Sequence, residues 1–135
     1  MLRSFLIYLS KAAWAQKLVT SWGFAWRTAS RFVAGTKLSD AMRVVRELNA
    51  KGINVTLDHL GEHTNTPEES QQATDDIFAT LDALGADSSA RGNVSIKLTQ
   101  IGLGLDESLC AQNLERILAR AKKNNTFVRV DIEDT

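Results

Sequence analysis

Three short runs of mainly β-branched residues each lead into side chains that can carry charge. They cover residues 55–62, 94–100 and 127–134. Lys97 lies in the second run and Asp131 in the third. A lysine in such a place can hold a substrate carboxylate, or become a Schiff-base nucleophile when desolvation lowers its pKa. Spacing alone does not choose between these two chemistries.

Each run has the length and composition of a β-strand, and one helix-length amphipathic segment separates it from the next. The order strand, helix, strand, helix, strand is typical of a right-handed parallel sheet. Before the first run, apolar residues recur at helical spacing from Leu38 to Leu48, and Gly52 follows as a stop. We therefore expect three parallel strands, each entered from a helix.

Both connecting segments carry signals for the start of a helix. Thr66 precedes Pro67, and Glu69 follows three residues after Thr66, which is the pattern of a capping box with proline in the first turn. Asp106 is expected to cap the next helix, and Asn124 with Asn125 to end it. The apolar stripes expected on these two helices are Ala73, Ile77, Leu81 and Leu84, then Leu109, Cys110, Leu114, Ile117, Leu118 and Ala121.

Parity separates the two faces of the expected sheet, because successive side chains of a strand point to opposite sides. One face is apolar and suits a layer of helices; it carries Val55, Leu57, Val94, Ile96, Leu98, Val128, Val130 and Ile132. The other is polar in all three runs; it carries Thr56, Asp58, Ser95, Lys97, Thr99, Arg129, Asp131 and Glu133. Buried charges need partners, so these groups form either a mutually neutralising network or a ligand site.

A shared polar face argues against an open, doubly wound sheet, whose strands are usually apolar on both faces. It favours a (β/α)8 barrel, in which inward residues near the strand C-termini form the ligand-binding mouth. Such a barrel takes about 250 residues. We therefore predict that residues 36–135 form the first three strand and helix units of a TIM-like barrel, preceded by a helical segment at residues 1–35.

Composition limits the classes of partner. Sixteen basic residues balance sixteen acidic ones without a basic block, so nucleic acid is not expected as a partner. The apolar start of the chain is too short, between its charges, for a membrane span or a signal peptide, which predicts a cytoplasmic protein. The single cysteine, Cys110, is expected in the core. His59 and His63 are interpreted as loop residues rather than metal ligands.

Four motifs resemble the bacterial proline dehydrogenase family. They are RFVAG at 31–35, TLDHLGE at 56–62, VSIKLTQIGL at 94–103 and RVDIED at 129–134. The resemblance covers essentially the whole chain, but only the N-terminal half of the family's catalytic domain. Four motifs in the family's order are more specific than any one of them. The departures are mild: His59 replaces a frequent tyrosine or leucine, and Ile132 a frequent methionine.

The resemblance implies a distorted, flavin-dependent (β/α)8 barrel that oxidises L-proline to Δ1-pyrroline-5-carboxylate in proline catabolism. Hydride would pass from the proline ring to FAD, and electrons would then pass to a quinone or another acceptor. Reduction of a quinone would bring the protein into peripheral contact with the inner membrane.

The same resemblance assigns roles to individual residues. Lys97 would help to bind the substrate carboxylate, and Asp131 would be the catalytic carboxylate that faces flavin and substrate. Glu62 would pair with an arginine of the family's last helix, beyond residue 135. Most FAD contacts, and the arginines that clamp proline, would also lie beyond residue 135. The pocket-lining residues expected in this chain are Asp58, Thr99 and Glu133.

Two other functions stay open on the sequence. A Schiff-base, aldolase-like barrel would use Lys97 as its nucleophile. A non-catalytic fragment or pairing subunit would bind no flavin, because three strands cannot enclose the cofactor. The 135-residue chain by itself is expected to be inactive, and the unpaired edge of its third strand predicts self-association.

Overall fold

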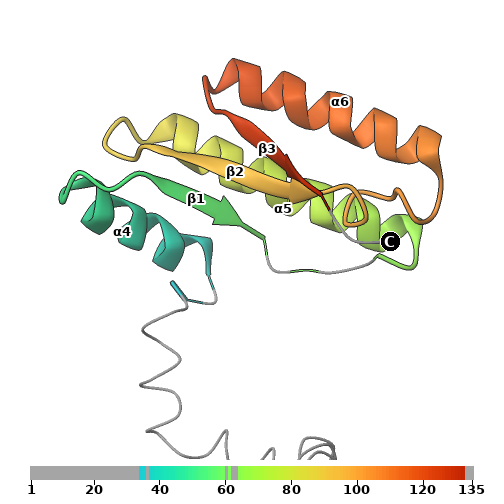
Figure 1. The fold of residues 1–135 in the computed structure, drawn as a ribbon, viewed down its shortest axis with the longest axis horizontal. Coiled ribbons are helices and arrows are strands. Elements are labelled where there is room, and N and C mark those ends of the chain that lie inside the picture. Colours follow the sequence, from blue (N-terminus) through green and yellow to red (C-terminus); the bar gives the residue numbers. More distant parts are fainter. Residues whose placement is uncertain (1–33, 36, 60, 62–63, 133–135) are drawn as a thin grey trace, which may run out of the picture. The chain divides into compact units, whose positions relative to one another are not determined.

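The computed structural model describes residues 34–35, 37–59, 61 and 64–132. The elements are α4 (Leu38–Asn49), β1 (Val55–Asp58), α5 (Pro67–Ala86), β2 (Gly92–Lys97), α6 (Glu107–Lys123) and β3 (Val128–Asp131). They belong to one compact unit that begins at Leu38, and Figure 1 shows their arrangement. The helical segment predicted for residues 1–35 lies outside the described residues, apart from its last two positions.

The three strands form a parallel sheet in the order β1-β2-β3, which confirms the predicted alternation. Each strand is shorter than the run that predicted it, because β2 ends at Lys97 and β3 at Asp131. Thr99 therefore lies in the turn after β2 and not on the polar face of the strand, where parity had placed it. The turn begins there because the amide of Gln100 donates to the carbonyl oxygen of Lys97 at 3.2 Å.

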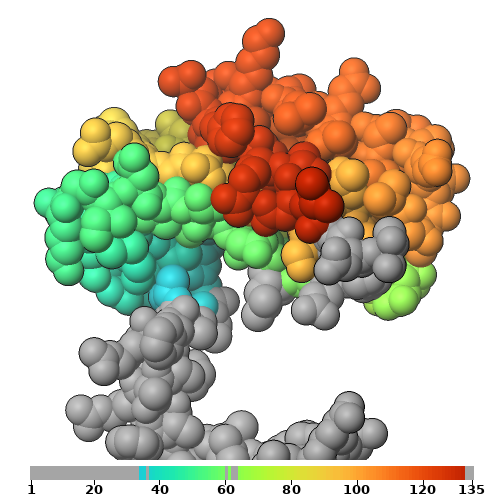
Figure 2. Space-filling model, in the orientation of Figure 1, coloured from blue at the N-terminus to red at the C-terminus, as the bar shows by residue number. Residues whose placement is uncertain are grey.

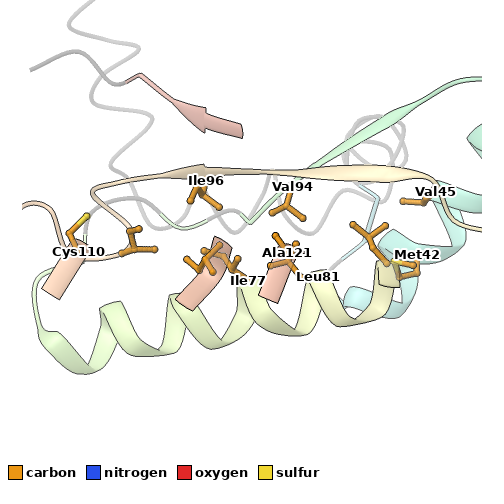
Figure 3. Packing of buried hydrophobic residues seen from close by; sticks show 11 residues of the cluster. Met42, Val45, Ile77, Leu81, Val94, Ile96, Cys110 and Ala121 are labelled. Atoms are coloured by element: carbon orange, nitrogen blue, oxygen red, sulfur yellow. The ribbon is translucent and has the colours of Figure 1, made fainter. Parts of the chain in front are cut away.

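The core lies between the sheet and the helices. Figure 3 shows Val94 and Ile96 pointing from β2 toward Ile77 and Leu81 of α5. Both β2 side chains are at most 1% exposed, and burial of each stabilises the fold by roughly 1.5–3 kcal/mol. The core cluster consists of Met42, Val45, Ile77, Leu81, Leu84, Val94, Ile96, Ile101, Cys110, Ile117 and Ala121. The apolar face of the sheet is thus the face that the helices cover.

The predicted helix caps are confirmed. Thr66 begins α5 and its hydroxyl accepts the amide of Glu69 at 3.2 Å, with Pro67 in the first turn. Asp106 begins α6 in the same way and accepts the amide of Leu109 at 2.9 Å. Asn125, with φ of 49°, is the left-handed residue just beyond α6. Among the described residues, no helix has the length and apolarity needed to cross a membrane.

The buried lines of α5 and α6 differ in part from the predicted stripes. In α5, Ser70 and Thr74 are fully buried, whereas Ala73 is only partly buried. In α6, Asn113 is buried and Leu118 is 48% exposed. The reason is a polar contact between the helices: the Asn113 amide donates to the Ser70 hydroxyl at 3.3 Å and to the carbonyl oxygen of Ile101 at 3.1 Å. A stripe based on hydrophobicity alone could not include these residues.

Cys110 is buried, as predicted. Its side chain is 4% exposed, and its thiol donates to the carbonyl oxygen of Leu98 at 3.7 Å. Burial raises the pKa of this thiol. The residue is therefore an unreactive part of the core.

The outer edge at β3 is only partly covered. The sequence places Val130 and Ile132 on the apolar, helix-covered face, but they are 41% and 100% exposed. Ile132 lies beyond the end of β3, and among the described helices none covers this edge as α5 covers β2. Self-association through this edge stays a prediction.

A buried side-chain amide fixes the N-terminal ends of the first two strands. Asn49, the last residue of α4, is 8% exposed. Its Nδ2 donates to the carbonyl oxygens of Ile53 and Arg91, both at 2.9 Å, and its Oδ1 accepts the amide of Arg91 at 2.5 Å. One side chain therefore ties the end of α4 to the entries of β1 and β2.

Asn49→Ala is expected to lower the free energy of unfolding by about 2–4 kcal/mol, since it removes three hydrogen bonds and leaves buried backbone groups unpaired. Urea unfolding measures this loss. Arg43→Ala is the control, because its pair with Glu47 is 56% and 57% exposed and should contribute no more than about 0.5 kcal/mol. Equal stability of the two variants would contradict the role given to Asn49.

Asp87 joins the end of α5 to α4. The pKa of its carboxyl group is lowered from 3.8 to about 2, first by a hydrogen bond from the Ser89 hydroxyl and then by one from Arg46. The Ser89 hydroxyl lies 2.6 Å from Oδ1, and Arg46 Nη1 lies 2.7 Å from Oδ2. Because the folded state lowers this pKa, Asp87 stabilises the fold above the ordinary value and loses that contribution as the pH falls toward 2.

We therefore expect Asp87→Asn to be less stable than the parent protein at pH 6, and the difference to shrink between pH 4 and pH 2. Urea unfolding of both proteins across this pH range measures the difference between their free energies of unfolding. The other carboxyl groups are common to both proteins, so their contributions cancel. A difference that stayed constant with pH would show that Asp87 does not act through its charge.

Candidate functional site

The face of the sheet opposite the helices carries six of the polar side chains predicted by parity: Thr56, Asp58, Ser95, Lys97, Arg129 and Asp131. The strand register sets them in three rows. The first row pairs Thr56 with Asn93, the second runs from Asp58 through Ser95 to Arg129, and the third pairs Lys97 with Asp131. The last two rows stand at the C-terminal ends of the strands, where ligands bind in barrels of this type. Figure 2 shows β3, in red, on the exposed surface of the view.

Asp131 is held by two side chains of this face. Arg129 Nε donates to Oδ1 at 2.6 Å, and Arg129 Nη2 donates to Oδ2 at 3.3 Å. The hydroxyl of Ser95, on the neighbouring strand, also donates to Oδ2. These hydrogen bonds, Arg129 first and Ser95 second, lower the pKa of Asp131, and the charges of Arg129 and Lys97 act in the same direction. Asp131 is therefore a carboxylate at neutral pH.

Arg129 lies between two carboxylates. Its pKa is raised first by the hydrogen bond to Asp131 and the charge of that group, and further by the charge of Asp58. Asp58 is exposed at the end of β1. Charges of opposite sign thus act on one another on this face: Asp58 on Arg129, and Arg129 and Lys97 on Asp131.

Lys97 and Asp131, the two residues given the main roles on the sequence, lie opposite one another on β2 and β3. Lys97 is half-buried, and its charge contributes to the low pKa of Asp131. Two cations and two carboxylates therefore share a small area at the strand ends. This arrangement can recognise a ligand that carries both a carboxylate and an ammonium group.

Gln100 supports the site, and sequence reasoning gave it no role. It is 2% exposed, and its Nε2 donates to the carbonyl oxygen of His59 at 2.9 Å and to that of Gly61. Its Oε1 accepts the amide of Lys97 at 3.1 Å. The sequence carried a signal for this role. In the run 94–100, alternation puts Gln100 on the same side as Leu98, so a polar amide stands on the apolar face. Gln100 fixes the loop after β1 to the end of β2.

The other predicted residues that the structure describes, Thr99 and His59, lie in the segments that follow the strands. Thr99 is half-buried in the turn, where its carbonyl oxygen accepts the hydroxyl of Thr64 at 2.9 Å. His59 lies in the loop after β1, with Nε2 3.5 Å from Asp76 Oδ2 of α5. The described residues contain no group of three metal-ligating side chains. Glu62, His63 and Glu133 lie outside the described residues.

Gln100→Ala is expected to reduce the free energy of unfolding by about 2–4 kcal/mol, because three backbone groups lose a buried partner. Hydrogen exchange at the amide of Lys97, whose proton Gln100 Oε1 accepts, should also become faster. Gln72→Ala is a matched control, since Gln72 hydrogen-bonds Asp76 on the exposed side of α5. Unchanged exchange at the Lys97 amide would contradict the role of Gln100 as the link between the two strand ends.

Comparison with known proteins gives a consistent result. Residues 41–135 match the family model described as proline dehydrogenase. The chain is 33% identical over 132 residues to Proline dehydrogenase 2 of Bacillus subtilis (strain 168), an alignment that covers 98% of this chain and 43% of that protein. It is 38% identical over 112 residues to Proline dehydrogenase of Deinococcus radiodurans, covering 81% of this chain and 36% of the relative. The chain thus spans less than half the length of these relatives.

A solved structure shows the same fold. It is the crystal structure of proline utilization A (PutA) from Bdellovibrio bacteriovorus inactivated by N-propargylglycine. The match has a TM-score of 0.67 at 18% identity, and it covers 76% of this chain and 13% of the other. The three parallel strands and their helices are accordingly part of an α/β barrel, as the polar face predicted.

Proposed function

Because the chain belongs to the proline dehydrogenase family, we propose that it supplies the first three strands of a barrel that oxidises L-proline to Δ1-pyrroline-5-carboxylate. The observation that carries this proposal is the row formed by Lys97 and Asp131 at the strand ends. It lies within the residues that match the family model. The position of the row at the C-terminal end of a parallel sheet is where a barrel binds its substrate.

The charges of this face suit proline. At neutral pH proline carries a carboxylate and a ring ammonium group, and in our proposal Lys97 donates to the carboxylate. A charge-assisted hydrogen bond of this kind is about twice as strong as a neutral one. Asp131 keeps the local charge balanced, because a lysine at the mouth of a barrel is costly without a neighbouring anion.

Oxidation of proline removes a hydride from the ring carbon next to nitrogen and a proton from nitrogen, and it forms the C=N bond of the product. FAD, when bound, supplies the hydride acceptor. The donor set of the polar face fits such a pocket, since Lys97 and Arg129 provide cationic hydrogen-bond donors around one carboxylate. In our proposal Lys97 and Asp131 border the pocket, and most cofactor contacts come from the part of the family's domain that this chain does not span.

The acceptor of the electrons is proposed to be a quinone or another small oxidant. The protein is proposed to be cytoplasmic. If the acceptor is a quinone, the protein would contact the surface of the inner membrane. Glu62 is proposed to pair with an arginine outside this chain, and Asp58, Thr99 and Glu133 to lie at the border of the pocket. The role of Glu62 rests on the family motifs, and those of Asp58, Thr99 and Glu133 rest on their places near the strand ends.

Lys97→Ala, in the whole protein that carries this chain, is expected to raise the KM for proline about tenfold to a hundredfold, because a charge-assisted hydrogen bond contributes roughly 1.5–3 kcal/mol. The measurement is proline-dependent reduction of a dye, together with flavin absorbance of the purified protein. Lys51→Ala is the control, since Lys51 is an exposed lysine in the turn after α4. N-propargylglycine should inactivate the parent protein, and proline should slow that loss.

The same preparation separates the other functions. A protein without flavin absorbance and without proline oxidation would overturn the proposal and favour a non-catalytic subunit. Trapping of a lysine adduct by borohydride would favour a Schiff-base enzyme. If flavin is bound and proline is oxidised but Lys97→Ala has the KM of the parent protein, the role of Lys97 as the carboxylate ligand is wrong.

A further inference from the structure

Two side chains of the polar face surround Asp131, and the proposed function gives neither a separate role in the reaction. Arg129 lies two residues before Asp131 on the same face of β3, and Ser95 lies beside both on β2. Ser95 is 1% exposed, although it stands on the face that the helices do not cover. The question is what a buried hydroxyl and an arginine do beside the carboxylate of Asp131.

The three side chains form a closed set of hydrogen bonds. The hydroxyl of Ser95 donates its one proton to Oδ2 of Asp131 and accepts from Arg129 Nη2 at 3.3 Å. Arg129 reaches both oxygens of Asp131, through Nε at 2.6 Å and Nη2 at 3.3 Å. Because both carboxylate oxygens are bound, Asp131 cannot rotate or move without breaking hydrogen bonds.

The charges around this set favour one state of Asp131. The groups that face it are Arg129 on its own strand and Lys97 on β2, and Asp58 on β1 acts on Arg129. The pKa of Asp131 is lowered as a result. A carboxylate of low pKa is a weak base near neutral pH, where an efficient general base has a pKa close to the working pH. Its value to a site is then its fixed negative charge.

We propose that Arg129 and Ser95 are positioning residues, which hold Asp131 as a carboxylate at a fixed place opposite Lys97 so that the lysine is directed toward the substrate. This inference rests on the proposed function of the chain. Arg129 supplies a positive charge and hydrogen bonds to both oxygens of the Asp131 carboxylate, and Ser95 sets the distance between β2 and that carboxylate. The alternative is an ion pair that stabilises the sheet and has no effect on the reaction.

The test uses Arg129→Gln, Arg129→Lys and Ser95→Ala in the whole protein that carries this chain. We expect kcat/KM for proline to fall about tenfold to a hundredfold in Arg129→Gln, because small displacements of a binding group have effects of this size. Most of the change should appear in KM. Arg129→Lys, which keeps the charge but loses the planar fork, should lie between Arg129→Gln and the parent protein.

The pH dependence distinguishes positioning from simple stabilisation. Without the hydrogen bonds from Arg129 or Ser95, the Asp131 carboxyl should take up its proton at higher pH. The acid limb of the kcat/KM profile should therefore move to higher pH in Arg129→Gln and Ser95→Ala. Arg43→Gln is the matched control, because Arg43 pairs with Glu47 on the exposed side of α4. An acid limb that stays in place in folded Arg129→Gln and Ser95→Ala would overturn the proposal.

A second measurement does not depend on activity. The 13C chemical shift of the Asp131 carboxyl, assigned with Asp131→Asn, reports its titration directly. We expect the midpoint to move to higher pH in both variants, and equal midpoints would overturn the proposal even in a protein that does not oxidise proline. If Arg129→Gln does not fold, Ser95→Ala gives the same decision. Failure of the proposed function appears separately, as a parent protein without flavin or proline oxidation.

Discussion

The arrangement of the site depends on the burial of two side chains of the middle strand. Val94 and Ile96 of β2 pack against the helices and are at most 1% exposed. Because successive side chains alternate across a strand, this packing turns Ser95 and Lys97 to the opposite face. A shift of the strand by one residue would bury Lys97 in an apolar core at a cost of several kcal/mol. The hydrophobic effect therefore fixes the direction of the polar groups.

Buried amides then fix where the strands begin and end. Asn49 holds the entries of β1 and β2, and Gln100 holds the loop after β1 against the end of β2. Asn113 links α6 to α5 and to the turn after β2. These contacts satisfy backbone groups that a parallel sheet leaves unpaired at its ends. Gln100 reaches the amide of Lys97 itself, and Arg129 and Ser95 hydrogen-bond the carboxylate of Asp131 on the neighbouring strand.

Much of the fold follows from the sequence, because its signals are local. The strand order, both helix caps and the polar face could be predicted from spacing, capping residues and parity, and the structure confirms them for the described residues, except that Thr99 lies in the turn after β2. The exact strand ends could not, because the turn at Gln100 depends on a hydrogen bond that no periodicity reveals. Parity put Arg129 beside Asp131 without indicating that it grips the carboxylate. The roles of Lys97 and Asp131 came from family motifs and stay proposals.

The partly covered edge at β3 fits a chain that spans 43% of the length of a relative. Exposed apolar side chains such as Val130 and Ile132 are what a further strand and helix would cover in a barrel. The polar face is likewise open in the described residues, since three strands cannot close a barrel. The chain accounts for one wall of the proposed substrate site.

The central claim is that this wall binds the carboxylate of proline through Lys97. The most direct measurement is a crystal structure of the whole protein with an analogue of proline whose ring nitrogen is replaced by oxygen, which cannot form the C=N bond of the product. We expect the carboxylate of the analogue within hydrogen-bonding distance of Lys97 Nζ, on the face opposite α5. An analogue bound elsewhere, without contact to Lys97, would contradict the account.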